Sequence, residues 1–286
     1  RAEQLLREFF QFHALAVEDA LRESHVPKID DWDGYLYVVF HTTAVDPETE
    51  ELCLQELDVF LGPNYLVTYH QGPLKYLAEA REAIERDPRD RMRHGADHLL
   101  FRFLDRSVDE SLAAIETLDE SIDQIQDAVL AHPGPRALQR IFRIKRAAIR
   151  LQKTFSPQRE VLNKLSRDPY PVVREQHRVY FRDVYDHIVR IHDISEGLRD
   201  LIAGTLDTYL SVSANRTNEI MKTLTMVTVM FMPMSFVVGF FGMNFFGLTM
   251  ALDAPMPRWS LFFGSLVVMA LSPVAMLALA RRRGWF

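Results

Sequence analysis

The sequence predicts an α+β domain with long helices, followed by two C-terminal transmembrane helices. Residues before about position 73 have strand-like alternation, and residues 74–222 have the three-to-four spacing of apolar side chains that indicates helix. Two uncharged apolar segments, 223–252 and 259–280, lie near the end of the chain. A bilayer core of about 30 Å requires roughly 20 apolar residues in a helix, so each segment is long enough to span a membrane.

Residues 1–73 are expected to form part of a cytoplasmic α/β domain. Apolar spacing predicts a helix over 4–21. Aromatic and β-branched residues predict strands at 35–40, 52–60 and 65–69, with a turn at Gly62-Pro63-Asn64 between the last two. Because the chain begins at Arg1 rather than Met, we expect an N-terminal portion of this domain to be missing.

Residues 74–171 are expected to form a helical hairpin of the same cytoplasmic domain. The first helix ends at Pro133-Gly134-Pro135, the second runs from about 136 to 165, and Asp168-Pro169-Tyr170-Pro171 marks the next boundary. No proline follows until Pro233, so residues 172–241 are predicted to form one stalk helix that continues as the first transmembrane helix.

The flanks of the two spans predict their orientation. The external loop, taken as 242–258 with the tripeptide Gly242-Met243-Asn244, carries only Asp253 and Arg258, whereas the tail 281–286 begins with three arginines. Basic residues favour the cytoplasmic side. We therefore expect an integral membrane protein with 259–280 as its second span and both termini in the cytoplasm.

Composition excludes several classes of function. The first 222 residues contain 38 acidic and 29 basic side chains, since only Asp253 and four arginines follow. A body with this excess of negative charge is unsuited to binding nucleic acid and attracts cations. A single cysteine, Cys53, excludes an intrachain disulfide and is expected in the core. No phosphate loop, zinc-protease helix or nucleophile elbow occurs, so an enzyme is not expected. The acids Asp119, Asp123 and Asp127 indicate a solvated helix face.

A polar or small-residue stripe continues along the long helix into its apolar part. At 100° per residue its members lie within an arc of roughly 140°. They are Asp207, Ser211, Ala214, Asn218, Met221, Leu224, Thr225, Thr228, Met232, Ser235 and Gly239. Such residues also mediate plain helix packing in membranes. If the stripe lines a pore, several copies of the chain are needed around an axis, with the second span outside. Met221, Leu224 and Met232 would then form apolar gates, and Thr228 and Ser235 would offer hydroxyls to hydrated cations.

Several segments together resemble the CorA family of divalent-cation transporters. These are Gly242-Met243-Asn244 after the first span, 215–222 (NRTNEIMK), 231–234 (FMPM), the tail 281–286 (RRRGWF), 180–187 (YFRDVYDH) and 13–19 (HALAVED). The resemblance implies a funnel-shaped homopentamer in a bacterial or archaeal inner or cell membrane, in contact with lipid. It would move Mg²⁺, and also Co²⁺ or Ni²⁺, down the electrochemical gradient without an organic cofactor. Gly242, Met243 and Asn244 would form the selectivity filter, where amide oxygens bind the water shell of Mg²⁺.

The resemblance also implies regulatory Mg²⁺ sites between subunits that hold the pore closed. Asp19 and Asp183 match those positions, with Glu18 as the expected helper, and Asp207 would attract ions near the narrow end of the funnel. The loop departs from the family pattern because Phe245-Phe246-Gly247 follows the tripeptide and Asp253 is its only acid. This departure weakens the case for ion recruitment by loop carboxylates.

Two alternatives follow from other features. A Zn²⁺ transporter of the ZntB type, with or without proton coupling, is suggested because Asp183 and His187, at i and i+4, could hold a softer ion. A membrane-anchored helical scaffold without transport would have the same architecture and would be insensitive to Asn244→Ala.

Overall fold

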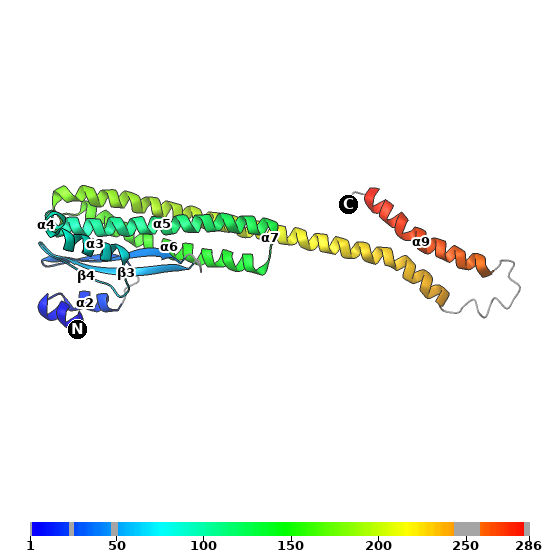
Figure 1. Ribbon diagram of the computed structural model, residues 1–286, viewed down its shortest axis with the longest axis horizontal. Helices are drawn as coiled ribbons and strands as arrows, with labels where there is room; N and C mark the ends of the chain where they lie inside the picture. The colour runs from blue at the N-terminus through cyan, green and yellow to red at the C-terminus, as the bar shows by residue number, and fades with distance from the viewer. Residues whose placement is uncertain (1, 23–25, 47–50, 243–257, 283–286) are drawn as a thin grey trace. The chain divides into compact units, whose positions relative to one another are not determined.

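The computed structural model describes residues 2–22, 26–46, 51–242 and 258–282. The chain divides into two compact units, Arg1–Leu210 and Ser211–Phe286, and the division falls within one long helix. The first unit holds a four-stranded antiparallel sheet and a group of helices; the second holds the remainder of the long helix and one further described helix, α9 (Arg258–Arg282) (Figure 1).

The sheet has the strand order β1-β2-β3-β4. Its strands are β1 (Lys28–Trp32), β2 (Tyr35–Val45), β3 (Leu52–Leu61) and β4 (Leu66–Tyr69). The three predicted strands are thus present. β1 was not predicted, because its sequence KIDDW lacks a clear apolar alternation; it is a strand because it pairs with β2 across a turn in which Gly34 has φ +91°.

Alternate residues of the strands enter two separate cores. Leu36, Val38 and Phe40 face a large core shared with the long helices, whereas Tyr35, Tyr37 and Val39 face a smaller core under the N-terminal segment. Figure 1 shows α2 (Ala14–Leu21) below the sheet and α5 (Ala96–Ala131) above it. The sheet therefore separates residues of α2 from residues of the long helices within one chain.

The prediction of one continuous helix over 4–21 is wrong. The segment consists of α1 (Ala2–Gln4), the π-helical turn η1 (Leu5–Phe9) and α2, with Gln11 at φ +56° between them. The break lets Phe12 stack on Phe60 at a ring-centroid distance of 4.2 Å in the smaller core. α2 then restarts with His13 as its N-cap, whose Nδ1 accepts a hydrogen bond from the Leu15 N–H at 3.2 Å.

Helices dominate the rest of the first unit. α3 (Lys75–Arg86) and α4 (Pro88–Met92) precede α5, and α6 (Pro135–Arg167) returns antiparallel to it after the predicted Pro-Gly-Pro turn. Apolar side chains of α5, α6 and α7 (Arg178–Gly242) form the large core with the sheet. The acids Asp119, Asp123 and Asp127 are exposed on α5, as predicted.

The long helix begins later than predicted, because Arg174 and His177 are held by α5. The 3₁₀ turn η2 (Glu175–His177) precedes α7. Asp97, buried in the first turn of α5, accepts hydrogen bonds from the Arg174 N–H at 3.0 Å and from His177 Nδ1 at 2.8 Å. These bonds fix the entry into α7 and prevent the helix from starting at residue 172.

The expectation that Cys53 lies in the core is also wrong, since this thiol is exposed. Its neighbour Leu52 is buried in the large core, so alternation along β3 directs Cys53 to the opposite face. The smaller core does not include any residue at that end of β3.

Candidate cation sites

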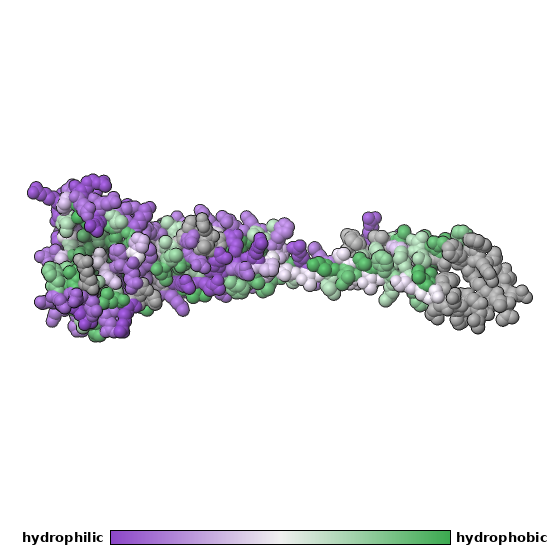
Figure 2. All heavy atoms as spheres, turned by 60° about the horizontal axis from the view of Figure 1, so that its bottom comes forward, coloured by the Kyte–Doolittle hydropathy of each residue, from purple (hydrophilic) through white to green (hydrophobic). Residues whose placement is uncertain are grey.

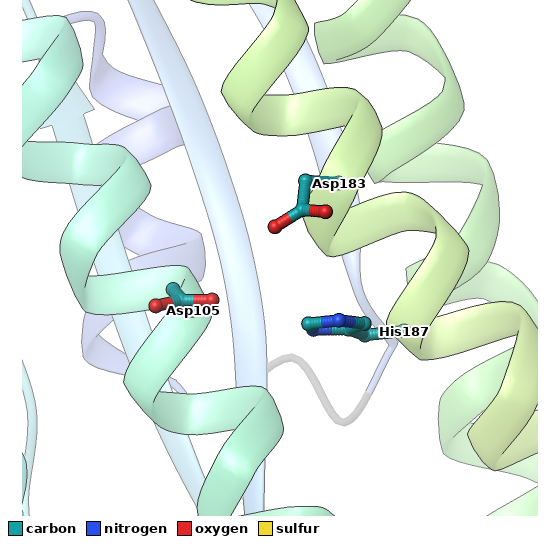
Figure 3. A group of neighbouring side chains, drawn as sticks. All are labelled: Asp105, Asp183 and His187. Atoms are coloured by element: carbon teal, nitrogen blue, oxygen red, sulfur yellow. The ribbon is translucent and has the colours of Figure 1, made fainter.

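Asp105, Asp183 and His187 form a group of side chains that could hold a metal ion. One ligand atom from each lies within 4.8 Å of the others. Asp105 comes from α5, whereas Asp183 and His187 lie one turn apart on α7, and Figure 3 shows the three side chains facing the space between the two helices. Asp183 and His187 are exposed and Asp105 is half-buried, so a cation can reach the group from solvent.

The electrostatics of this group favour an added positive charge. Burial raises the pKa of Asp105 above its ordinary value, and Asp109 and Asp183 raise it further, while His187 and Arg106 oppose them. A divalent ion would relieve this repulsion. Carboxylate oxygens suit Mg²⁺, and the imidazole adds a ligand that Co²⁺, Ni²⁺ or Zn²⁺ binds more readily.

The sequence had singled out Asp183 and His187 but not Asp105. Asp105 looks like one of many charged residues on the solvated side of α5, and no local pattern connects it with a helix that begins at residue 178. Only the packing of α5 against α7 brings the three residues together.

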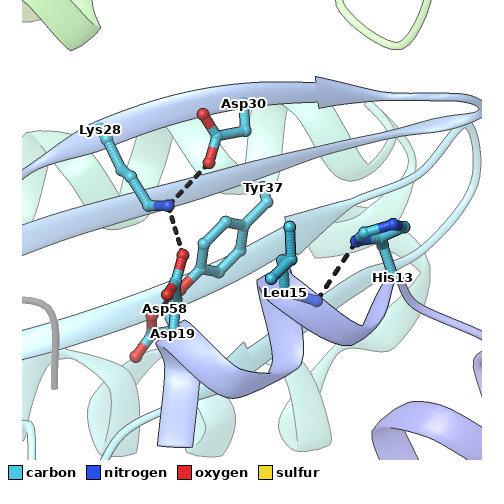
Figure 4. Close-up of polar contacts among 7 residues, drawn as sticks. All are labelled: His13, Leu15, Asp19, Lys28, Asp30, Tyr37 and Asp58. Atoms are coloured by element: carbon cyan, nitrogen blue, oxygen red, sulfur yellow. Dashed lines mark hydrogen bonds and ion pairs between the residues drawn. The ribbon is translucent and has the colours of Figure 1, made fainter. Parts of the chain in front are cut away.

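Asp19 is held by a lysine within its own chain. Lys28 Nζ lies 2.5 Å from Asp19 Oδ2 and 2.8 Å from Asp30 Oδ2 (Figure 4). Burial lowers the pKa of Lys28, but the hydrogen bonds that its ammonium group donates to Asp19 and Asp30, together with their negative charges, outweigh this effect and raise the pKa above its ordinary value. A metal ion that binds Asp19 has to compete with this ammonium group.

Glu18 and Asp19 do not join Asp183 within one chain. Glu18 forms a surface ion pair with Arg22 at 2.6 Å, and Asp19 lies on α2, across the sheet from the core that contains α5 and α7. The predicted partnership of Glu18, Asp19 and Asp183 could therefore form only between two different copies of the chain.

A buried carboxyl group lies close to Lys28 and Asp19. Asp58 is 2% exposed, and Tyr37 donates its hydroxyl hydrogen to Asp58 Oδ1 at 2.6 Å (Figure 4). Burial raises the pKa of Asp58 to about 8, although the Tyr37 hydrogen bond acts in the opposite direction. The folded protein thus retains a proton on Asp58 at neutral pH.

This retained proton predicts a pH dependence of stability. Asp58 has an ordinary pKa of 3.8, so between about pH 4 and pH 8 the folded state holds a proton that the unfolded state has lost. Its stabilising contribution is complete below that range and is lost as pH rises towards 8. Between pH 5 and pH 8 we expect the wild type to lose on the order of 3 kcal/mol more of its free energy of unfolding than Asp58→Asn, measured by urea unfolding. Parallel pH profiles of the two proteins would contradict this assignment.

The polar stripe predicted along the long helix is exposed in the structure. Its site members are all exposed: Asp207 in the first unit, and Asn218, Met221, Leu224, Thr225, Thr228, Met232, Ser235 and Gly239 in the second. The Thr228 hydroxyl donates to the Leu224 carbonyl at 2.9 Å, which leaves its oxygen lone pairs available as acceptors.

A different face of α7 is partly covered in the second unit. This covered seam comprises Met226, Val229, Met230, Pro233, Met234 and Val237. The helix α9 of the same unit has a matching half-buried row, Met269, Ser272, Pro273 and Met276. At 100° per residue, the covered seam points roughly 140° away from the polar stripe.

Among the described residues, one helix, Glu175–Gly239, is long and apolar enough to cross a membrane. It comprises η2 and most of α7, and its apolar residues are concentrated towards the C-terminal end of α7. α9 includes a shorter apolar stretch, Leu266–Met276. Figure 2 shows the described surface of the second unit as mostly green to white, whereas the first unit is largely purple. Of the predicted loop 242–258, Gly242 is the last residue of α7 and Arg258 the first of α9. Residues 243–257, with Met243 and Asn244, lie outside the described residues.

An apolar helix of membrane-spanning length, joined to an acidic unit with a group of carboxylates and an imidazole, favours the class of membrane proteins that handle cations. The chain belongs to the CorA-like Mg²⁺ transporter family, whose model matches residues 1–282. This is a family of transporters rather than enzymes.

Individual relatives agree with this assignment. The chain is 34% identical over 283 residues to the cobalt/magnesium transport protein CorA of Thermotoga maritima, covering 99% of this chain and 79% of that protein. Its fold matches the complete structure of the CorA magnesium transporter from Methanocaldococcus jannaschii with a TM-score of 0.80 at 21% identity, over 99% of this chain and 87% of the other. The ZntB cytoplasmic domain from Vibrio parahaemolyticus matches less well, with a TM-score of 0.55 at 14% identity, over 74% of this chain and 82% of that domain.

Proposed function

We propose that several copies of this chain form a channel that moves hydrated Mg²⁺, and also Co²⁺ or Ni²⁺, across a membrane down its electrochemical gradient. The observation that carries the proposal is the exposed polar stripe of α7, which lies away from the covered seam. A helix with one seam packed and a separate polar stripe exposed in a single chain suits assembly around a water-filled axis. A homopentamer, as the family resemblance implies, would provide that axis.

The proposed topology has two spans, with both termini in the cytoplasm. α9 has 25 residues, or roughly 37 Å of helix, which exceeds the apolar thickness of a bilayer. Arg281 and Arg282 in its last turn favour the cytoplasmic side. α9 would then form an outer, lipid-facing ring, while the stripe of α7 faces the axis.

Ion selection is proposed at Gly242, Met243 and Asn244, at the outer end of the pore. Mg²⁺ holds its water shell tightly, so a ring of amide oxygens can accept hydrogen bonds from those waters without dehydrating the ion. Thr228 and Ser235 would continue this role further along the stripe. Met221, Leu224 and Met232 would close the pore to water when they approach the axis.

Closure is proposed to depend on Mg²⁺ bound between subunits. The group of Asp105, Asp183 and His187 is solvent-accessible on one side of the sheet domain, whereas Asp19 and Glu18 lie on the other. A ring of subunits can bring these opposite sides together. Mg²⁺ would then replace Lys28 as the partner of Asp19, and its loss at low internal Mg²⁺ would loosen the interface.

Removing the carboxylates of the α5–α7 group is expected to weaken Mg²⁺ protection of the closed state. Asp183→Ala and Asp105→Ala should each raise the Mg²⁺ concentration that gives half-maximal protease resistance about tenfold, because each removes one charged ligand. Asp119→Ala, an exposed acid on the same helix as Asp105, is the matched control. Unchanged Mg²⁺ dependence in Asp183→Ala would count against the regulatory site.

Zinc transport is the second candidate, because His187 supplies an imidazole to the same group. Uptake into proteoliposomes separates the candidates: Mg²⁺ influx that needs no pH gradient and slows with Mg²⁺ on the cytoplasmic side supports the channel. Zn²⁺ influx that requires a proton gradient, without Mg²⁺ influx, would support the alternative. If no divalent ion crosses the membrane, the hypothesis of a membrane-anchored scaffold without transport would be favoured.

A further inference from the structure

A groove runs along α6 on the side that faces the ends of β2 and β3. It consists of two hollows that share Leu52 and Arg150. The larger, about 500 Å³, is lined by His41, Leu52, Leu54, Glu56, Arg150, Lys153 and Thr154. The smaller, about 110 Å³, is lined by Glu51, Leu52, Arg143, Arg146, Ala147 and Arg150. We call this the α6 groove; it lies wholly within the first unit.

One wall of the α6 groove is a row of cations. Arg143, Arg146, Arg150 and Lys153 recur at three-to-four spacing on α6, over roughly 15 Å of helix. Arg146, Arg150 and Lys153 are exposed and form neither an ion pair nor a side-chain hydrogen bond with any described residue. On the opposite wall are Glu51 and Glu56, so the groove retains a net positive charge even when both carboxylates are ionised.

The larger hollow also contains a buried polar atom without a partner. The His41 side chain is 3% exposed, and its Nε2 faces Glu56 Oε2 at 3.3 Å. Its Nδ1 is buried and has no hydrogen-bond partner. Although Glu56 Oε2 is also buried, its contact with His41 Nε2 is not a hydrogen bond. If the His41 ring turns towards the hollow, a ligand hydroxyl or amino group can donate to Nδ1. Such an unmet buried acceptor costs free energy until a donor binds it.

We propose that the α6 groove binds a nucleoside polyphosphate. The phosphates would lie along Arg146 and Arg150, where a linear polyanion matches the row of cations. The nucleoside would occupy the larger hollow against Leu52 and Leu54. A turn of the His41 ring towards the hollow would let the nucleoside donate a hydrogen bond to His41 Nδ1, which is buried in the ligand-free chain. A volume of about 500 Å³ is in the range of small-molecule sites. Inorganic polyphosphate shares the anionic chemistry but would leave the His41 end unfilled.

Equilibrium binding to the full chain in phosphatidylcholine nanodiscs tests the proposal, because this neutral lipid does not compete for cations. The probes are radiolabelled ATP, inorganic tripolyphosphate and adenosine. ATP is expected to bind, and Arg146→Gln and Arg150→Gln should each weaken it about tenfold by removing a charge-assisted hydrogen bond. Tripolyphosphate should compete at least about tenfold more weakly than ATP. Binding is measured without ion flux, so the result does not depend on transport.

The matched control is Lys145→Gln, which removes an exposed cation of α6 that lines neither hollow. It is expected to bind ATP like the wild type. Thermal unfolding midpoints verify that the variants are folded, as expected for exposed side chains. Absence of ATP binding would overturn the proposal. An equal loss of ATP affinity in Lys145→Gln and Arg150→Gln would overturn it too, because ATP would then be attracted by the overall positive charge of α6 and not by the groove. Equal affinities for ATP and tripolyphosphate would overturn the placement of the nucleoside.

Discussion

Asn244→Ala is expected to reduce Mg²⁺ influx into proteoliposomes to the rate of protein-free liposomes. The alanine methyl group cannot accept hydrogen bonds from the waters around Mg²⁺, so the ion would meet an apolar ring where its hydration shell needs partners. In other recognition systems, a hydrogen-bonding site rejects a ligand that leaves its polar groups unpaired by factors of about 10⁴, which indicates how large the loss from unpaired polar groups can be. An indicator dye enclosed in the liposomes measures the influx.

Asn215→Ala is the matched control for this experiment. It makes the same chemical change in an exposed residue of α7, on the side of the covered seam rather than of the polar stripe. Influx through this variant should equal that of the wild type. If Asn244→Ala shows the same Mg²⁺ influx as the wild type, the proposed selectivity filter is wrong. If the wild type itself shows no more influx than protein-free liposomes, the scaffold hypothesis is favoured.

Asp97→Ala is expected to lower the free energy of unfolding by about 3 kcal/mol. The Asp97 side chain is 2% exposed and accepts hydrogen bonds from the Arg174 N–H and from His177, which is itself buried. Alanine would leave the buried His177 imidazole and the Arg174 N–H without this acceptor. Urea unfolding of the detergent-solubilised chain at pH 7 measures the loss, which corresponds to roughly a hundredfold change in the folding equilibrium.

The same substitution should also weaken the candidate metal group. Asp97 fixes the start of α7 against α5, and Asp105 and Asp183 lie about two turns further along the same helix pair. Mg²⁺ protection is therefore expected to weaken in Asp97→Ala although no ligand has changed. Asp109→Ala removes an exposed acid that pairs with Arg106 at 3.7 Å, and should cost less than about 0.5 kcal/mol. A similar cost in both variants would contradict the anchoring role of Asp97.

The local elements were largely predictable because their signals are local. Alternation predicted β2, β3 and β4, the Pro-Gly-Pro turn separated α5 from α6, and the absence of proline predicted the long helix. The failures occurred where distant residues override local preference. The helix over 4–21 breaks so that Phe12 can reach Phe60, and the long helix starts late because Asp97 holds His177.

The candidate sites divide in the same way. Family resemblance drew attention to Asp19 and Asp183, and helical spacing paired Asp183 with His187. The third member of the group, Asp105, and the lysine that holds Asp19 came only from the packed chain. The cations of the α6 groove are visible in the sequence, but their position beside His41 is not.

By itself the sequence determined three of the four strands, the helical hairpin, the long helix, the apolar segments and the polar stripe, because each depends on side-chain periodicity over a few residues or turns. The tertiary structure alone decided that Asp105 joins Asp183 and that Asp19 lies across the sheet from both. These facts depend on how helices and strands pack, and packing is set by the combined fit of many buried side chains distant in sequence. No periodic pattern within one segment records that fit.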